Sequence, residues 1–200
     1  MDVIQALKTA TSRVAERYFW LSVAGQGAPV KRERVYCYEL YHQLRCLLPA
    51  GGALTLSAEP DKRGHPDFQG RQPNPDLIFH EPGTHRSNQA VIEVECRPDR
   101  RHLRKDFETF RLLKDKGYRE FVLLLFGVLG VPWQRLAQVA EEVGLPLEEV
   151  AVLLHQAPGQ EATRESGGTV PNPCEAPGYK GQKTPLTKNS SRQRQYRSLG

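Results

Sequence analysis

The sequence predicts an α/β sandwich built around a mixed β-sheet. Segments with helical periodicity alternate with short apolar runs, and two of these runs flank a turn-forming segment. A third, very apolar run follows a long helical segment, as in a strand-helix-strand crossover. A meander of strands before such a crossover gives a sheet with both antiparallel and parallel pairs.

Two helices are expected before the first strand. Apolar residues recur at helical spacing across residues 3–22 and again across 32–48, where Tyr36 and Leu40 mark one face. The sequence PAGG ends the second helix, and ALTLSA at 53–58 is predicted to be a strand. The first helix could pack against the domain or join a homodimer.

The remaining elements begin with a hairpin. They are strands at 76–80 and 91–95, a helix at 99–117, a strand at 121–127, a helix at 132–144, and a helix or a last strand at 147–156. The run FVLLLFG is too apolar for an edge, so we expect a central strand that is covered on both faces.

The chain divides into a folded part at 1–158 and a basic tail at 159–200. Residues 1–159 hold 21 Lys and Arg against 20 Asp and Glu, whereas residues 160–200 hold 7 against 3. The tail is rich in Pro, Gly, Ser and Gln, so we expect it to be disordered. No run approaches the roughly 20 apolar residues of a membrane span. The N-terminus has no secretory pattern, so we expect a cytoplasmic protein without a membrane partner.

Three carboxylates fall on one face of the predicted hairpin. Side chains alternate across a strand, so Glu93 and Glu95 lie on the same face about 6.6 Å apart. With His80 opposite Val91, Asp76 would lie opposite Glu95 and diagonal to Glu93. Facing like charges destabilise a sheet, and burial would raise their pKa values. A divalent cation removes this conflict, because Mg²⁺ binds one or two carboxylates together with water and phosphate oxygens.

The acids also resemble the motifs of the PD-(D/E)XK nuclease superfamily. Pro75 and Asp76 match the PD element, and Glu93-Val94-Glu95 matches the (D/E)XK element. This resemblance implies a restriction-endonuclease-like α/β/α sandwich with a mixed central sheet of four or more strands. It also implies a metal-dependent nuclease that hydrolyses phosphodiester bonds of nucleic acid, with DNA as the expected substrate.

The element order supports the resemblance across residues 33–127, where a helix carrying Glu39 precedes the sheet. Under the resemblance, Asp76 and Glu93 bind Mg²⁺ together with the backbone carbonyl of Val94, and Mn²⁺ is a substitute. Glu39 would reach the site from its helix and bind a second ion. The alternative for Glu39 is a surface pair with a neighbouring basic residue.

One position departs from the family pattern, because Glu95 stands where the family usually has Lys. Glu95 could act as the base or as a further metal contact, or Lys105 from the following helix could replace the missing Lys. Arg97, Arg101 and Arg104 share the side of Lys105 and would neutralise backbone phosphates.

The alternative is a catalytically inactive nucleic-acid-binding or partner-docking module. The loss of the family's Lys would fit a domain that keeps the fold and no longer cuts. Residues 134–156 also suggest a helix-turn-helix with Gly144 in the turn, which would suit a binding module.

Overall fold

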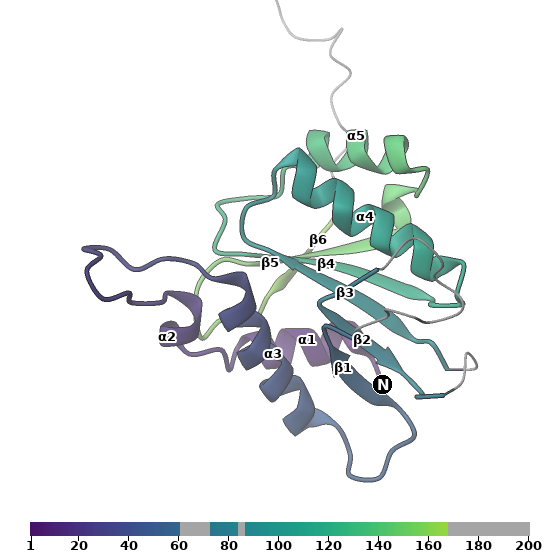
Figure 1. Ribbon diagram of the computed structural model, residues 1–200, viewed down its shortest axis with the longest axis horizontal. Coiled ribbons are helices and arrows are strands. Elements are labelled where there is room, and N and C mark those ends of the chain that lie inside the picture. The colour runs from purple at the N-terminus through teal and green to yellow at the C-terminus, as the bar shows by residue number, and fades with distance from the viewer. Residues whose placement is uncertain (61–72, 84–86, 168–200) are drawn as a thin grey trace, which may run out of the picture. The chain divides into compact units, whose positions relative to one another are not determined.

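The structure, a computed structural model, describes residues 1–60, 73–83 and 87–167. Its elements are α1 (Val3–Thr11), α2 (Glu16–Phe19), α3 (Glu33–Leu47), β1 (Thr55–Ala58), β2 (Leu77–His80), β3 (Ala90–Glu95), α4 (Arg100–Lys114), β4 (Glu120–Phe126), α5 (Trp133–Val143), the 3-10 helix η2 (Leu147–Glu149), β5 (Val150–His155) and β6 (Thr163–Glu165). The strands form one sheet in the order β1-β2-β3-β4-β5-β6 (Figure 1). The β3-β4 and β4-β5 pairs are parallel and the others are antiparallel, which confirms the predicted mixed sheet.

Helices cover both faces of the sheet. Leu77 and Ile92 pack in one core with α1 and α3, whereas Ile78 and Val91 pack in a second core with α4 and α5 (Figure 1). Strand β4 lies between these layers with residues 121–126 all buried, so the predicted central strand is confirmed. Because side chains alternate along β3, the odd-numbered residues after Val91 also face the α4 side.

An aromatic cluster holds α3 against the sheet. The ring of Tyr36 stacks on Phe126 with centroids 3.9 Å apart, and its hydroxyl forms a 2.7 Å hydrogen bond with Nδ1 of His155. Burial lowers the pKa of His155 to about 4, so the ring is neutral at pH 7. This anchor fixes the helix whose first turn carries Glu33.

Helix α4 forms where the sequence predicts it. The Asp99 carboxylate caps its N-terminus and accepts hydrogen bonds from the backbone N–H groups of Arg101 and His102 at 2.9 and 3.0 Å. Leu103 and Phe107 then bury one face of the helix against the sheet. The cap and the apolar stripe together fix which side chains of α4 face β3.

The predicted helix at 3–22 is wrong in its length, because the chain forms α1 and the short α2 instead. At the end of α1 the hydroxyls of Thr11 and Ser12 donate to the carbonyl oxygens of Lys8 and Thr9. Such local bonds compete with continuation of a helix. The apolar periodicity continues across the break and does not reveal it.

The C-terminal part also differs from expectation. Segment 147–156 forms η2 and β5, so of the two predicted alternatives the strand is confirmed. This segment contains no α-helix, so the predicted helix-turn-helix is wrong. The sheet continues past the predicted boundary at residue 158, because β6 pairs with β5. Most of the predicted tail, residues 168–200, lies outside the described residues. Within the described ranges, no helix has the length and apolarity that a membrane crossing needs.

Candidate metal and catalytic site

Asp76 and Glu93 lie side by side where β2 meets β3. The ladder pairs Val91 with Ile78, so the predicted partner His80 is wrong by two residues. The register also pairs Leu77 with Ile92. One residue further along, Asp76 lies opposite Glu93 and not opposite Glu95. The Oδ2 atom of Asp76 accepts a 2.7 Å hydrogen bond from the backbone N–H of Val94. That bond ties Asp76 to the strand that carries Glu93.

Glu93 is the most constrained acid of the site. Its side chain is fully buried, and its ionised carboxylate has no hydrogen-bond donor among the described residues. Glu93 and Asp76 can form a hydrogen bond with each other only when they share a proton. Burial raises the pKa of Glu93 well above 4.5, and the nearby charges of Asp76 and Asp106 raise it further. A buried carboxylate without a donor is costly, so this position needs an explanation beyond packing.

Helix α4 brings a further acid and a lysine to Glu93. Asp106 is 3% exposed, and its Oδ1 atom lies 3.4 Å from Nζ of Lys105. Burial raises the pKa of Asp106, whereas the neighbouring ammonium of Lys105 lowers it. Burial alone would lower the pKa of Lys105, but Glu93, Asp106 and Asp76 outweigh it and raise that pKa. Lys105 therefore remains a cation beside three acids.

A second acidic pair joins α3 to the end of β3. Glu33, Glu95 and Cys96 each offer one ligand atom within 4.8 Å of the others, and no other such group of three occurs among residues 1–60, 73–83 and 87–167. Burial, followed by the charges of Glu95 and Asp76, raises the pKa of Glu33 to about 7. Burial raises the pKa of the Cys96 thiol to about 11, and hard divalent cations prefer oxygen to sulfur ligands. The useful ligands of this group are therefore the two carboxylates.

Glu95, the last residue of β3, has further polar contacts. Its Oε1 atom accepts a short hydrogen bond from the backbone N–H of Arg97, and its Oε2 atom lies 3.2 Å from Nδ1 of His102. Glu95 is 4% exposed and lies on the same face of β3 as Glu93. The structure thus brings Asp76 to Glu93 and brings Glu95 to Glu33.

Glu39, the acid predicted to come from the helix before the sheet, is not in this group. Its Oε1 atom accepts a 2.7 Å hydrogen bond from Nε2 of Gln43 on the same helix. Glu33 provides the carboxylate from α3 instead. Glu33 lies one turn before the buried residues Tyr36 and Cys37, and this helical spacing is a signal that could have identified it.

Asp106 was also missed, although the sequence carries a signal for it. It follows Leu103 by three residues and precedes Phe110 by four, so it occupies the buried stripe of α4. An acid on an apolar stripe is unusual unless it has a partner or a function. The helical spacing therefore marks Asp106 as clearly as strand alternation marks Glu93.

The predicted phosphate-binding arginines differ in their surroundings. Arg104 pairs with Glu108 at 3.0 Å and with Glu142 at 3.8 Å. Arg97 and Arg101 are exposed and form no side-chain ion pair within the described residues. These two are the better placed of the three to attract an anion.

The acids fit a hard divalent cation. Asp76, Glu93, Glu33 and Glu95 offer carboxylate oxygens, which Mg²⁺ and Mn²⁺ prefer. Two carboxylates and one thiol also differ from the sets rich in Cys and His that hold structural zinc. A cation beside Glu93 would also neutralise the carboxylate whose oxygens have no donor. Asp76 and Glu93 are therefore the residues that could hold such an ion.

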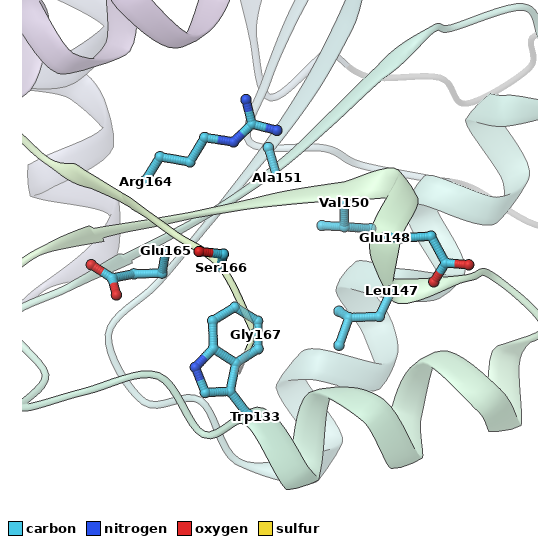
Figure 2. A pocket seen from close by; sticks show the side chains of 9 residues that line it. All are labelled: Trp133, Leu147, Glu148, Val150, Ala151, Arg164, Glu165, Ser166 and Gly167. Carbon is cyan, nitrogen blue, oxygen red and sulfur yellow. The ribbon is translucent and has the colours of Figure 1, made fainter. Parts of the chain in front are cut away.

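A separate pocket lies between α5, η2 and the last two strands. It has a volume of about 360 Å³, and Trp133, Glu148 and Arg164 are among the residues that line it (Figure 2). None of its lining residues belongs to the acidic site. The pocket and the acids of β2, β3 and α4 are thus distinct features.

No family model, curated protein or solved structure matched the chain in comparisons with known proteins. What the chain does must therefore be inferred from its own residues.

Proposed function

We propose that the protein is a metal-dependent nuclease that hydrolyses phosphodiester bonds, with DNA as the expected substrate. The observation that carries this proposal is the pairing of Asp76 with Glu93, whose buried oxygens have no hydrogen-bond donor among the described residues. A divalent cation would compensate both carboxylates at once. The element order α3, β1, β2, β3, α4, β4 also supports the resemblance to the PD-(D/E)XK nucleases.

Asp76 and Glu93, with the backbone carbonyl of Val94, would hold the ion. A bound Mg²⁺ or Mn²⁺ supplies a Lewis acid that stabilises negative charge on a phosphate. The hydrogen bond from the backbone N–H of Val94 keeps Asp76 beside β3. Asp76 is thus oriented beside the strand of Glu93 before any ion or substrate binds, as efficient catalysis requires.

Lys105 is the side chain best placed to replace the Lys that the family usually has. Its ammonium interacts with Glu93, Asp106 and Asp76, and these acids keep it protonated. A fixed cation at this place would stabilise the negative charge that develops on a phosphate under attack. Lys105 would therefore act as an electrostatic catalyst.

Glu33 and Glu95 would together accept the proton that the attacking water releases. Because the pKa of Glu33 is raised to about 7, this acid can take up or release a proton near neutral pH. Glu95, which contacts His102, would orient the carboxylate of Glu33. Arg97 and Arg101 are exposed at the same end of β3 and would bind backbone phosphates.

The test is nicking of supercoiled plasmid by the purified full chain with Mg²⁺ or Mn²⁺, with and without a chelator. We expect nicking that needs the ion and is lost in Asp76→Asn. Glu120→Gln is the matched control, because Glu120 is a strand acid at the start of β4, level with Ala90 at the other end of β3. DNA binding without cutting by the wild type would instead favour the inactive binding module.

A further inference from the structure

The geometry points to Asp106 as a positioning residue that holds the Lys105 ammonium beside Asp76 and Glu93. Asp106 has no counterpart in the motifs quoted above. Its function in catalysis rests on the proposed nuclease activity, whereas its hold on Lys105 does not. The two can therefore be tested separately.

The side chain of Lys105 turns back toward Asp106 on the same helix. Consecutive residues of a helix point about 100° apart, so Lys105 and Asp106 would not meet if both extended from the helix. Asp106 is 4% exposed in its side chain and faces the sheet, whereas the Lys105 side chain is 58% exposed. Yet Nζ of Lys105 lies 3.4 Å from Oδ1 of Asp106. The lysine must fold back around its helix to reach the acids.

Apart from Lys105, the carboxylate of Asp106 has few polar contacts. Its Oδ2 atom is buried and has no hydrogen-bond partner among the described residues. The ion pair with Lys105 is the contact that its other oxygen makes. A buried carboxylate on an apolar helix stripe is costly to keep. The position is explained if its Oδ1 atom fixes the ammonium of Lys105 on the side of α4 that faces β3.

Contact with Asp106 would restrict the movement of the long Lys105 side chain. A lysine stem has four rotatable carbons and loses much conformational entropy when its end is fixed. With Glu93 and Asp76 alone, a bound cation would neutralise the acids and weaken their attraction for Lys105. Asp106 lies on α4 itself and would keep the ammonium near the site when the cation is bound.

The hold on Lys105 can be measured without any activity. In [¹⁵N]lysine-labelled full chain with a chelator present, the ammonium group of Lys105 should be ordered and should relax faster than free lysine side chains. In Asp106→Asn it should become mobile, while Lys114, which pairs with Glu149, should not change. The missing signal in Lys105→Ala assigns the resonance. An equally ordered ammonium in wild type and Asp106→Asn would overturn the inference.

Kinetics then test the function of this contact. Asp106→Asn should lower kcat for nicking by about 10- to 100-fold, as loss of an orienting partner typically does, with KM for DNA unchanged. In the Lys105→Ala background the same substitution should add nothing, because its effect acts through the lysine. Asp115→Asn, at the exposed end of α4, is the matched control.

Two outcomes would contradict this function. A loss from Asp106→Asn that persists in full without Lys105, or that appears as weaker Mn²⁺ binding, would make Asp106 a metal ligand or a structural acid. A wild type that does not cut would refute the proposed nuclease, and the relaxation measurement alone would then decide whether Asp106 holds Lys105.

Discussion

Replacing Glu93 with glutamine should stabilise the protein when no divalent ion is present. Glu93 is fully buried beside Asp76 and Asp106, and its oxygens have no donor among the described residues. Glutamine has nearly the same shape and no charge. Burying the Glu93 carboxylate, or protonating it on folding, costs free energy. Glu93→Gln removes this cost, so its free energy of unfolding should be larger.

The size of the effect follows from proton linkage. Burial raises the pKa of Glu93 above 4.5 in the folded state, so folded protein keeps a proton that the unfolded chain releases as the pH rises through 4.5. Stability of the wild type is then lost with rising pH, by at most about 1.4 kcal/mol per pH unit. Between pH 4.5 and 7.5 this loss is at most about 4 kcal/mol. A gain of about 2 kcal/mol would raise Tm by roughly 4 to 8 °C.

The assay is thermal and denaturant unfolding of wild type and Glu93→Gln with a chelator, at several pH values from 4 to 8. The two proteins should be nearly equal at pH 4, and the variant should become progressively more stable above pH 4.5. Glu120→Gln should show no gain in stability that grows with pH, because Glu120 is only half-buried and its Oε1 atom accepts a hydrogen bond from Nε2 of Gln89. A Glu93→Gln variant that is less stable at pH 7.5, or a difference that does not depend on pH, would refute the reasoning.

Three further predictions concern the ion, the lysine and the arginines. Mg²⁺ or Mn²⁺ should raise the Tm of the wild type by binding linkage, and a rise that survives Asp76→Asn would place the ion elsewhere. Lys105→Ala should lower the nicking rate by about 10²- to 10³-fold if its ammonium stabilises the phosphate electrostatically in place of the family's lysine; if Glu95→Ala stops cleavage and Lys105→Ala does little, Glu95 has that function instead. Arg101→Ala should reduce the salt dependence of DNA binding by about one unit of slope, measured by fluorescence anisotropy, whereas Arg104→Ala should change it less because Arg104 is paired with Glu108.

The faces of the hairpin could be predicted from the sequence, but its register could not. Alternation in VIEVE places Glu93 and Glu95 on one face, and the structure agrees. The predicted pairing was shifted by two residues. A shift of two keeps every side chain on the same face, because the strand period is two. The turn, which sets the register, has no comparable pattern in the sequence.

The helix acid of the site was misassigned for a related reason. Glu33 and Glu39 lie on the same helix, but six residues rotate a helix by about 240°, so they point in different directions. The buried residues Tyr36, Cys37 and Leu40 define the face that meets the sheet. Only this stripe, and not the presence of a Glu, decides which acid reaches β3. Glu33 continues the stripe toward the N-terminus.

Strand β6 could not be predicted because it is short and polar. Thr163, Arg164 and Glu165 show no apolar alternation, and the strand lies at the edge of the sheet. Its hydrogen bonds to β5 define it, and such pairing leaves little trace in the sequence. The long buried β4 is the opposite case, since its apolar run requires cover on both faces.

The central claim is that the acids of β2 and β3 support ion-dependent cleavage of DNA. The most direct test measures plasmid nicking and Tm together for wild type, Glu93→Gln and Glu120→Gln, with Mg²⁺ or Mn²⁺ and with a chelator. We expect Glu93→Gln to be more stable than wild type in chelator and inactive with either ion, while Glu120→Gln still cuts. A stable Glu93→Gln that nicks DNA as fast as the wild type, or a wild type that nicks equally well in chelator, would contradict the claim.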